Sequence, residues 1–73
     1  MFKRRRHPGL NRHCIVSLFS GNAVAGVLTE TPGEFLIMRA AQVLEPGMNP
    51  ARVDGEIVIE QANVDYVQIT GNS

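Results

Sequence analysis

The sequence predicts an all-β domain, a small five-stranded and strongly bent barrel of the SH3-like type. Short apolar segments rich in β-branched residues recur along the chain, and clusters of turn-forming residues separate them. Several short strands spaced in this way are typical of a small barrel. Gly26 lies in the middle of the second segment, where a glycine marks a sharp bend or a close approach of two backbones. Strong strand curvature requires such positions.

The expected strands follow from the turn chemistry between them. Ser20-Gly21-Asn22 ends the first segment, Pro32-Gly33 ends the second, and Gln61-Ala62-Asn63 is a very short connection before the last. Residues 45–54 contain two prolines, a glycine and an asparagine, so we expect a loop there. Residues 10–13 have room for one helical turn but lack a capping residue. The predicted strands are residues 14–19, 23–31, 35–43, 55–60 and 64–70.

At 73 residues the chain is expected to form one domain, with an arm at residues 1–13, a barrel at 14–70 and a polar tail at 71–73. A chain of this length buries only about 60% of the surface that its unfolded form exposes. The single cysteine, Cys14, allows no internal disulfide, so oligomerisation is the expected source of further stability. No apolar run is long enough to span a membrane or to form a secretory signal. We therefore expect no membrane partner and a cytoplasmic or virus-particle location.

The charge is distributed unevenly although the net charge is zero. Residues 15–73 hold two arginines and seven carboxylates, a net charge of −5, whereas residues 1–14 carry +5 and no acid. Such a basic arm can bind phosphates, remain a solvated tail, or dock on the acidic surface of a neighbouring copy. The candidate binding residues of the arm are Lys3, Arg4, Arg5, Arg6 and Arg12.

Two short patterns resemble the motifs of the Sm and Sm-like family, and they cover most of residues 14–70. The first pattern has Gly21, Gly26 and Leu28 at the family spacing and continues into Phe35-Leu36-Ile37-Met38-Arg39-Ala40. The second consists of Ile57-Val58-Ile59 and Asn63-Val64. The resemblance implies an Sm-like barrel, here a divergent member for which a phage protein is one candidate source.

The residues that contact RNA in that family are replaced in this chain. RNA-binding members carry an aspartate and an asparagine in the turn before the third strand, where the chain has Thr31-Pro32-Gly33-Glu34. They also carry an arginine and a glycine in the second motif, where Glu60 and Gln61 stand. A carboxylate repels a phosphate chain. We therefore expect the barrel framework without the family's RNA contacts.

The resemblance also implies a ring in which the fourth strand of one copy pairs with the fifth strand of the next. We expect a non-enzymatic structural subunit of a larger assembly, with a virion capsid or connector as a candidate setting. Its partners would be itself and other protein subunits, with the arm docked on neighbours. The alternative is a nucleic-acid-binding ring that uses residues 3–12. The predicted interface residues are Ile57, Val58, Ile59, Val64, Tyr66 and Val67.

The sequence contains no convincing pattern for catalysis or for a cofactor. His7, His13 and Cys14 lack a fourth ligand for a metal, and Cys14 has no recognisable base beside it. Glu56 and Glu60 share a strand face without any sign of a pocket. Phe35 and Tyr66 could stack on bases, but barrel core or subunit interface is the preferred interpretation. We expect no enzyme activity, no cofactor and no metal.

Overall fold

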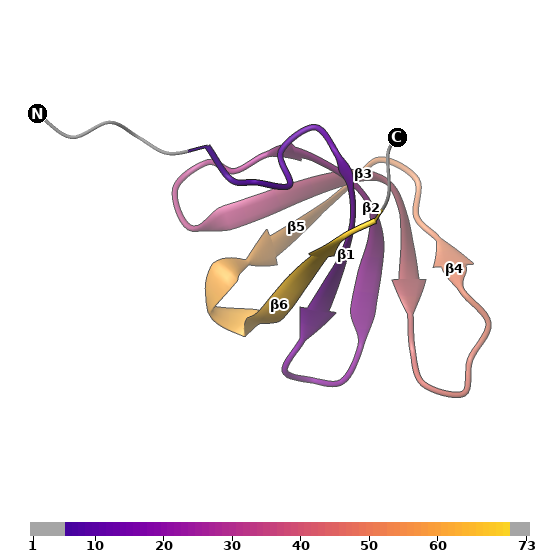
Figure 1. Ribbon diagram of the computed structural model, residues 1–73. Helices are drawn as coiled ribbons and strands as arrows, with labels where there is room; N and C mark the ends of the chain where they lie inside the picture. The colour runs from indigo at the N-terminus through magenta and orange to yellow at the C-terminus, as the bar shows by residue number, and fades with distance from the viewer. Residues whose placement is uncertain (1–5, 71–73) are drawn as a thin grey trace, which may run out of the picture.

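The computed structural model describes residues 6–70, which form one antiparallel sheet of six strands bent into an open barrel (Figure 1). The arm residues Lys3, Arg4 and Arg5 and the tail at 71–73 lie outside the described residues. The elements are β1 (His13–Leu18), β2 (Ala23–Glu30), β3 (Phe35–Leu44), β4 (Ala51–Arg52), β5 (Glu56–Glu60), a 3₁₀ turn η1 (Gln61–Asn63) and β6 (Val64–Ile69).

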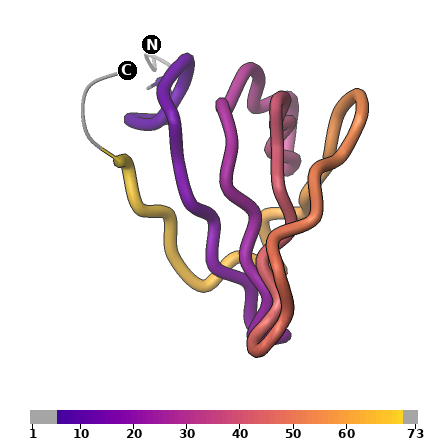
Figure 2. Tube along the Cα trace, turned by 90° about the vertical axis from the view of Figure 1, so that its right-hand side faces the viewer, coloured from indigo at the N-terminus to yellow at the C-terminus, as the bar shows by residue number. Residues whose placement is uncertain are grey.

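The strands pair in the order β4-β3-β2-β1-β6, and β5 pairs with the first half of β3. β3 is the longest strand, and it holds β5 along its first half and β4 near its end. The tube view shows how the strands curve around a common interior (Figure 2). The five predicted strands are confirmed to within about two residues at each end.

The core is built by alternate residues of the curved strands. Cys14 and Val16 of β1 are buried while their neighbours are only partly covered, as the period of two in a strand requires. Leu18, Ile57, Val64, Val67 and Ile69 pack against the cluster from its rim. The buried cluster itself consists of Cys14, Val16, Val24, Leu28, Leu36, Met38, Ala41 and Ile59.

A β-bulge between β2 and β3 interrupts the alternation of buried and exposed residues along β3. Ala25 pairs with Gln42 and Val27 pairs with Arg39, so Gly26 faces two residues of β3. Ala40 has a φ of 50°, and the buried positions of β3 shift from Leu36 and Met38 to Ala41. Bulges of this kind bend a strand and increase its twist. The bend predicted at Gly26 is therefore confirmed.

The prediction of an uninterrupted loop at residues 45–54 is wrong at two positions. Ala51 pairs with Val43 and Arg52 pairs with Gln42, forming the short strand β4. The amide of Val53 also donates to the carbonyl of Ala41 at 2.9 Å. The prolines precede β4, so they remove no donor from the ladder and do not prevent this pairing.

The helical turn for which residues 10–13 have room does not form. The amides of Leu10 and Arg12 donate to the carbonyls of His7 and Gly9, making two tight turns. Asn11 has a φ of 64°, a conformation that asparagine tolerates and that ends a right-handed helix. The amide of Asn11 donates to the carbonyl of Leu28 at 2.6 Å, which fixes the segment to β2.

The described chain begins and ends on neighbouring strands. The amide of Thr70 donates to the carbonyl of His13 at 3.0 Å, and its hydroxyl lies 2.6 Å from the Nδ1 atom of His13. Between residues 6 and 70, no helix is long and apolar enough to cross a membrane.

Candidate functional site

Two strand edges that follow one another in the sequence lack a partner within residues 6–70. β5 pairs only with β3, and β6 pairs only with β1, although a three-residue turn is all that separates them. Each strand therefore presents one row of backbone donors and acceptors without a partner strand. Such an edge is a template for pairing with another chain.

The predicted interface residues divide into two groups in the structure. Ile59 is 6% exposed and belongs to the core, and Ile57, Val64 and Val67 pack against that core. Val58 is 60% exposed and Tyr66 is 59% exposed, so both side chains stand on the outer face. Contacts at these edges would therefore combine backbone hydrogen bonds with the Val58 and Tyr66 side chains.

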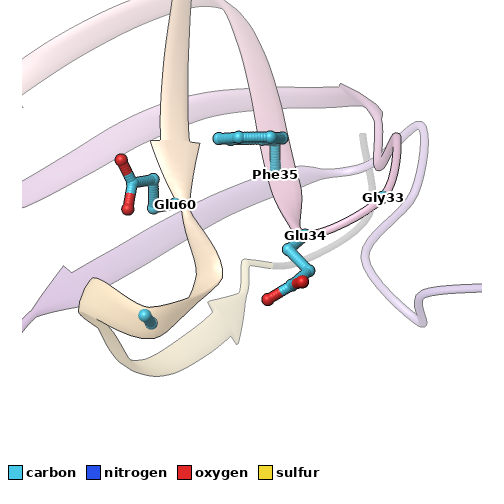
Figure 3. A pocket seen from close by; sticks show the side chains of 5 residues that line it. Gly33, Glu34, Phe35 and Glu60 are labelled. Atoms are coloured by element: carbon cyan, nitrogen blue, oxygen red, sulfur yellow. The ribbon is translucent and has the colours of Figure 1, made fainter.

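A pocket of about 420 Å³ lies at the start of β3, between the turn that precedes it and the end of β5 (Figure 3). Glu34 and Phe35 line it from the turn and β3, and Glu60 lines it from the end of β5. Phe35 and Glu60 are cross-strand neighbours, and the amide of Gln61 donates to the carbonyl of Glu34 at 2.8 Å. The pocket thus joins residues 31–34 and 60–61, the two segments at which the sequence departs from the Sm-like motifs. Its complete lining is Gly33, Glu34, Phe35, Glu60 and Ala62.

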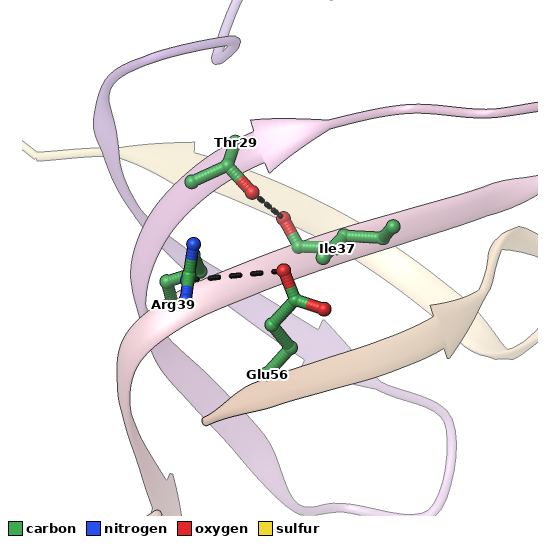
Figure 4. Close-up of polar contacts among 4 residues, drawn as sticks. All are labelled: Thr29, Ile37, Arg39 and Glu56. Atoms are coloured by element: carbon green, nitrogen blue, oxygen red, sulfur yellow. Dashed lines mark hydrogen bonds and ion pairs between the residues drawn. The ribbon is translucent and has the colours of Figure 1, made fainter. Parts of the chain in front are cut away.

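The pocket combines negative charge with an exposed aromatic ring. Phe35 is 42% exposed, which excludes it from the core. In the described part of the chain, Arg39 and Glu56 form the only ion pair, with 3.8 Å between Nε and Oε2 (Figure 4). Glu34 and Glu60 therefore have no cationic partner among residues 6–70. This arrangement favours a cation and opposes a phosphate.

Figure 4 also shows how the β2–β3 ladder is held beside this ion pair. The register shifts between Leu28 and Glu30, and the hydroxyl of Thr29 donates to the carbonyl of Ile37 at 3.2 Å. The Arg39 and Glu56 side chains are both exposed, so their pairing contributes at most about 1 kcal/mol.

Of the candidate binding residues in the arm, the structure describes Arg6 and Arg12. Arg6 and Arg12 are exposed, and Arg12 lies in the turn that precedes β1. Neither side chain lines the acidic pocket at the end of β5. The predictions made for Lys3, Arg4 and Arg5 fall outside the described residues.

Cys14 is a core residue. Its thiol is buried, lies 3.5 Å from the carbonyl oxygen of Gly9, and lies 3.4 Å from that of Arg12. Burial raises the pKa of the Cys14 thiol, and the nearby charge of Arg12 opposes this only in part. Within residues 6–70, no group of histidine, cysteine and acidic side chains is arranged to hold a metal ion.

The pocket could not have been located from the sequence without the strand register. Glu34 and Glu60 were singled out as replacements, but they are 26 positions apart in the sequence. Only the pairing of β3 with β5 places Glu60 opposite Phe35, the residue that follows Glu34. The continuous apolar run at the start of β3 concealed the fact that Phe35 faces outward while Leu36 faces inward.

Comparisons with known proteins support the fold. No protein-family model and no curated protein matches the sequence. Among solved structures, a heptameric archaeal Sm protein matches with a TM-score of 0.74 and 19% identity over 86% of this chain and 91% of its own. The Sm protein of Pyrococcus abyssii, solved with a uridine heptamer, matches with a TM-score of 0.74 and 24% identity over 89% of this chain and 100% of its own. A chain of the NatC complex bound to CoA matches with a TM-score of 0.76 and 17% identity over 96% of this chain and 90% of its own. The chain therefore has an Sm-like fold.

Proposed function

We propose that this protein is a non-enzymatic scaffold that associates with itself, in which β5 of one copy pairs with β6 of the next. The observation that carries the proposal is the pair of open edges on consecutive strands of one chain. One copy offers both halves of a head-to-tail contact. Repeating that contact generates a ring when the rotation closes.

The chemistry of the two edges is consistent with pairing. Neither β5 nor β6 contains a lysine or a proline, the residues with which proteins commonly block an exposed edge. Both strands instead expose an apolar or aromatic side chain, Val58 and Tyr66. Strand addition would supply backbone hydrogen bonds and would cover these side chains.

The structural neighbours support self-association. One of the matched Sm proteins is a heptamer. The NatC match is a chain of a multi-protein complex, which is the kind of setting we propose for this chain. A role in a larger assembly inside a cell or a virus particle, as a capsid or connector component, extends the same proposal. In that assembly the basic arm docks on neighbouring subunits.

The solution mass of the full chain tests this proposal. Sedimentation velocity and native mass spectrometry should show a discrete oligomer of several 8.0 kDa chains at micromolar concentration. A closed ring gives a single mass, whereas a growing filament gives a broad distribution. A monomer that persists at high concentration would refute the proposal.

A second candidate function is nucleic-acid binding through the arm. The observation in its favour is the matched Sm protein solved with a uridine heptamer, together with the exposed Arg6 and Arg12 of this chain. Binding through the arm should weaken steeply with salt, because each phosphate contact releases a counterion. It should also disappear when Arg4, Arg5 and Arg6 are replaced by alanine. Binding that is absent, or that salt does not weaken, would eliminate this candidate.

A further inference from the structure

We propose that the pocket formed by Glu34, Phe35 and Glu60 receives the basic segment at residues 3–6 of a second copy. This inference rests on the proposed self-association and adds the site and the chemistry of a second contact. The ligand is an arginine or lysine side chain, held against the ring of Phe35 and beside the Glu60 carboxylate, with Glu34 adding to the negative charge of the pocket.

The shape of the pocket suits a long cationic side chain. Gly33 and Ala62 contribute no bulk to its walls, and Phe35 keeps almost half of its surface exposed. A guanidinium group stacks well on an aromatic face and forms paired hydrogen bonds with carboxylates. Glu60 lies beside the Phe35 ring, whereas the Glu34 side chain points away from it (Figure 3). Because Phe35 and Glu60 are cross-strand neighbours, one cation can contact the ring and the Glu60 carboxylate together.

The sequence of this chain supplies the complementary charge. Among residues 6–70, Arg39 is already paired with Glu56 across β3 and β5. Arg52 lies on β4, which pairs with the far half of β3 from the pocket. The remaining basic residues are concentrated before β1, and Lys3, Arg4, Arg5 and Arg6 are consecutive. Each copy of the chain thus contributes one basic segment and one acidic pocket.

The position of the chain before β1 favours the arm of another copy over the copy's own arm. His7 lines a separate hollow of about 250 Å³ together with Leu36 and Gln61. Leu36 is a core residue and Phe35 is exposed, so their side chains stand on opposite faces of β3. His7 therefore lies on the inner side of β3, whereas Phe35 and the acidic pocket face the outer side.

Carbodiimide cross-linking tests this contact, because the reagent joins a carboxylate to an amine only when the two are in contact. Lys3 is the only lysine of the chain, so a cross-link from its amine reports the position of the arm. Isotopically labelled and unlabelled full-length chains are unfolded together, refolded as a mixture, cross-linked and mapped by mass spectrometry. The proposal predicts links from Lys3 to Glu34 or Glu60 that join labelled to unlabelled peptides.

Two variants establish whether the pocket selects the arm. Phe35→Leu keeps an apolar side chain but removes the aromatic face, so the yield at Glu34 and Glu60 should fall about two- to fivefold. Met48→Leu is the control on an exposed loop and should leave the yield unchanged. Replacing Arg4, Arg5 and Arg6 by glutamine should also lower the yield from Lys3.

The outcomes separate this contact from the proposed oligomer, whose mass is measured on the same sample. An oligomer in which Lys3 links equally to Glu30, Glu45 and the pocket residues would refute the pocket and leave the self-association standing. Links confined to peptides of the same label would show that each arm occupies its own pocket, which also overturns the proposal. A monomer without mixed links would refute both.

Discussion

Gly26 of β2 and Ala41 of β3 are in such close contact that a β-carbon on Gly26 would lie 2.9 Å from the α-carbon of Ala41. The same β-carbon would lie 2.8 Å from the carbonyl oxygen of Arg39. Both atoms belong to the backbone of a paired strand and cannot rotate aside. This contact permits the bulge that bends the two longest strands of the sheet.

Gly26→Ala should therefore destabilise the fold by about 1 to 3 kcal/mol, the usual effect of forcing a methyl group into a packed site. The midpoint of urea unfolding measures the change. Gly47→Ala is a useful comparison because a β-carbon there meets no atom within 4 Å, although φ is +77°. That variant should lose only about 1 kcal/mol from backbone strain. A Gly26→Ala protein as stable as the parent would contradict the close contact.

Ala40 provides the complementary prediction on the other strand of the bulge. Its φ of 50° lies in the left-handed region, which costs a residue with a β-carbon about 1 kcal/mol. Ala40→Gly removes that strain, but the greater freedom of glycine in the unfolded chain costs about 0.5 to 1 kcal/mol of folding free energy. The free energy of unfolding should therefore stay constant or rise slightly.

Ala41→Gly is the matched control for Ala40→Gly, since Ala41 is buried at the next position and has no left-handed backbone. It should lose about 1 to 2 kcal/mol from the missing methyl group and from the added entropy of the unfolded chain. Equal destabilisation by the two variants, measured by urea unfolding, would argue against the bulge.

The open edge of β5 predicts a separation of assembly from folding. Val58→Lys places a charge on an exposed face of that edge, where lysine is a common block against strand addition. The protein concentration below which the oligomer dissociates should be at least about tenfold higher for the variant than for the parent. The melting temperature should be nearly unchanged. Met48→Lys adds the same charge to an exposed loop residue and should leave the oligomer intact. If both variants dissociate alike, the effect is one of net charge and the β5 edge is not the interface.

Cys14 reports on the integrity of the barrel and on its response to pH. Because the thiol is buried with a raised pKa, it should react with alkylating reagents only as fast as the barrel opens. Above the pKa of an exposed thiol, the unfolded chain loses its proton first, so stability should fall as the pH rises toward the pKa of folded Cys14. Below that window the thiol makes no pH-dependent contribution. Rapid alkylation of the native protein would contradict the buried position.

The sequence was sufficient to predict the barrel because turn chemistry and strand alternation agreed. Gly26, the turns at Gly21 and Gly33, and the apolar segments around Val16 and Ile59 each favour the same topology. The structural neighbours and the confirmed strands agree with that prediction.

The features that the sequence could not predict depend on the register in which the strands pair. The two residues of β4 have no distinctive pattern, and they form a strand only because β3 extends to Leu44 beside them. The pocket requires Phe35 to lie opposite Glu60, and the left-handed Ala40 follows from a bulge whose partner is 14 positions earlier. These features are set by long-range pairing, which local propensity does not encode.

The central claim is that the outer edges of β5 and β6 are paired between copies, and residue-resolved amide hydrogen exchange tests it most directly. Amides on an open edge exchange rapidly, whereas amides in a ladder are protected. At concentrations where the oligomer forms, the account predicts protection along the outer edges of both Glu56–Glu60 and Val64–Ile69, lost together on dilution to the monomer. An oligomer in which those edges exchange as rapidly as in the monomer would contradict it.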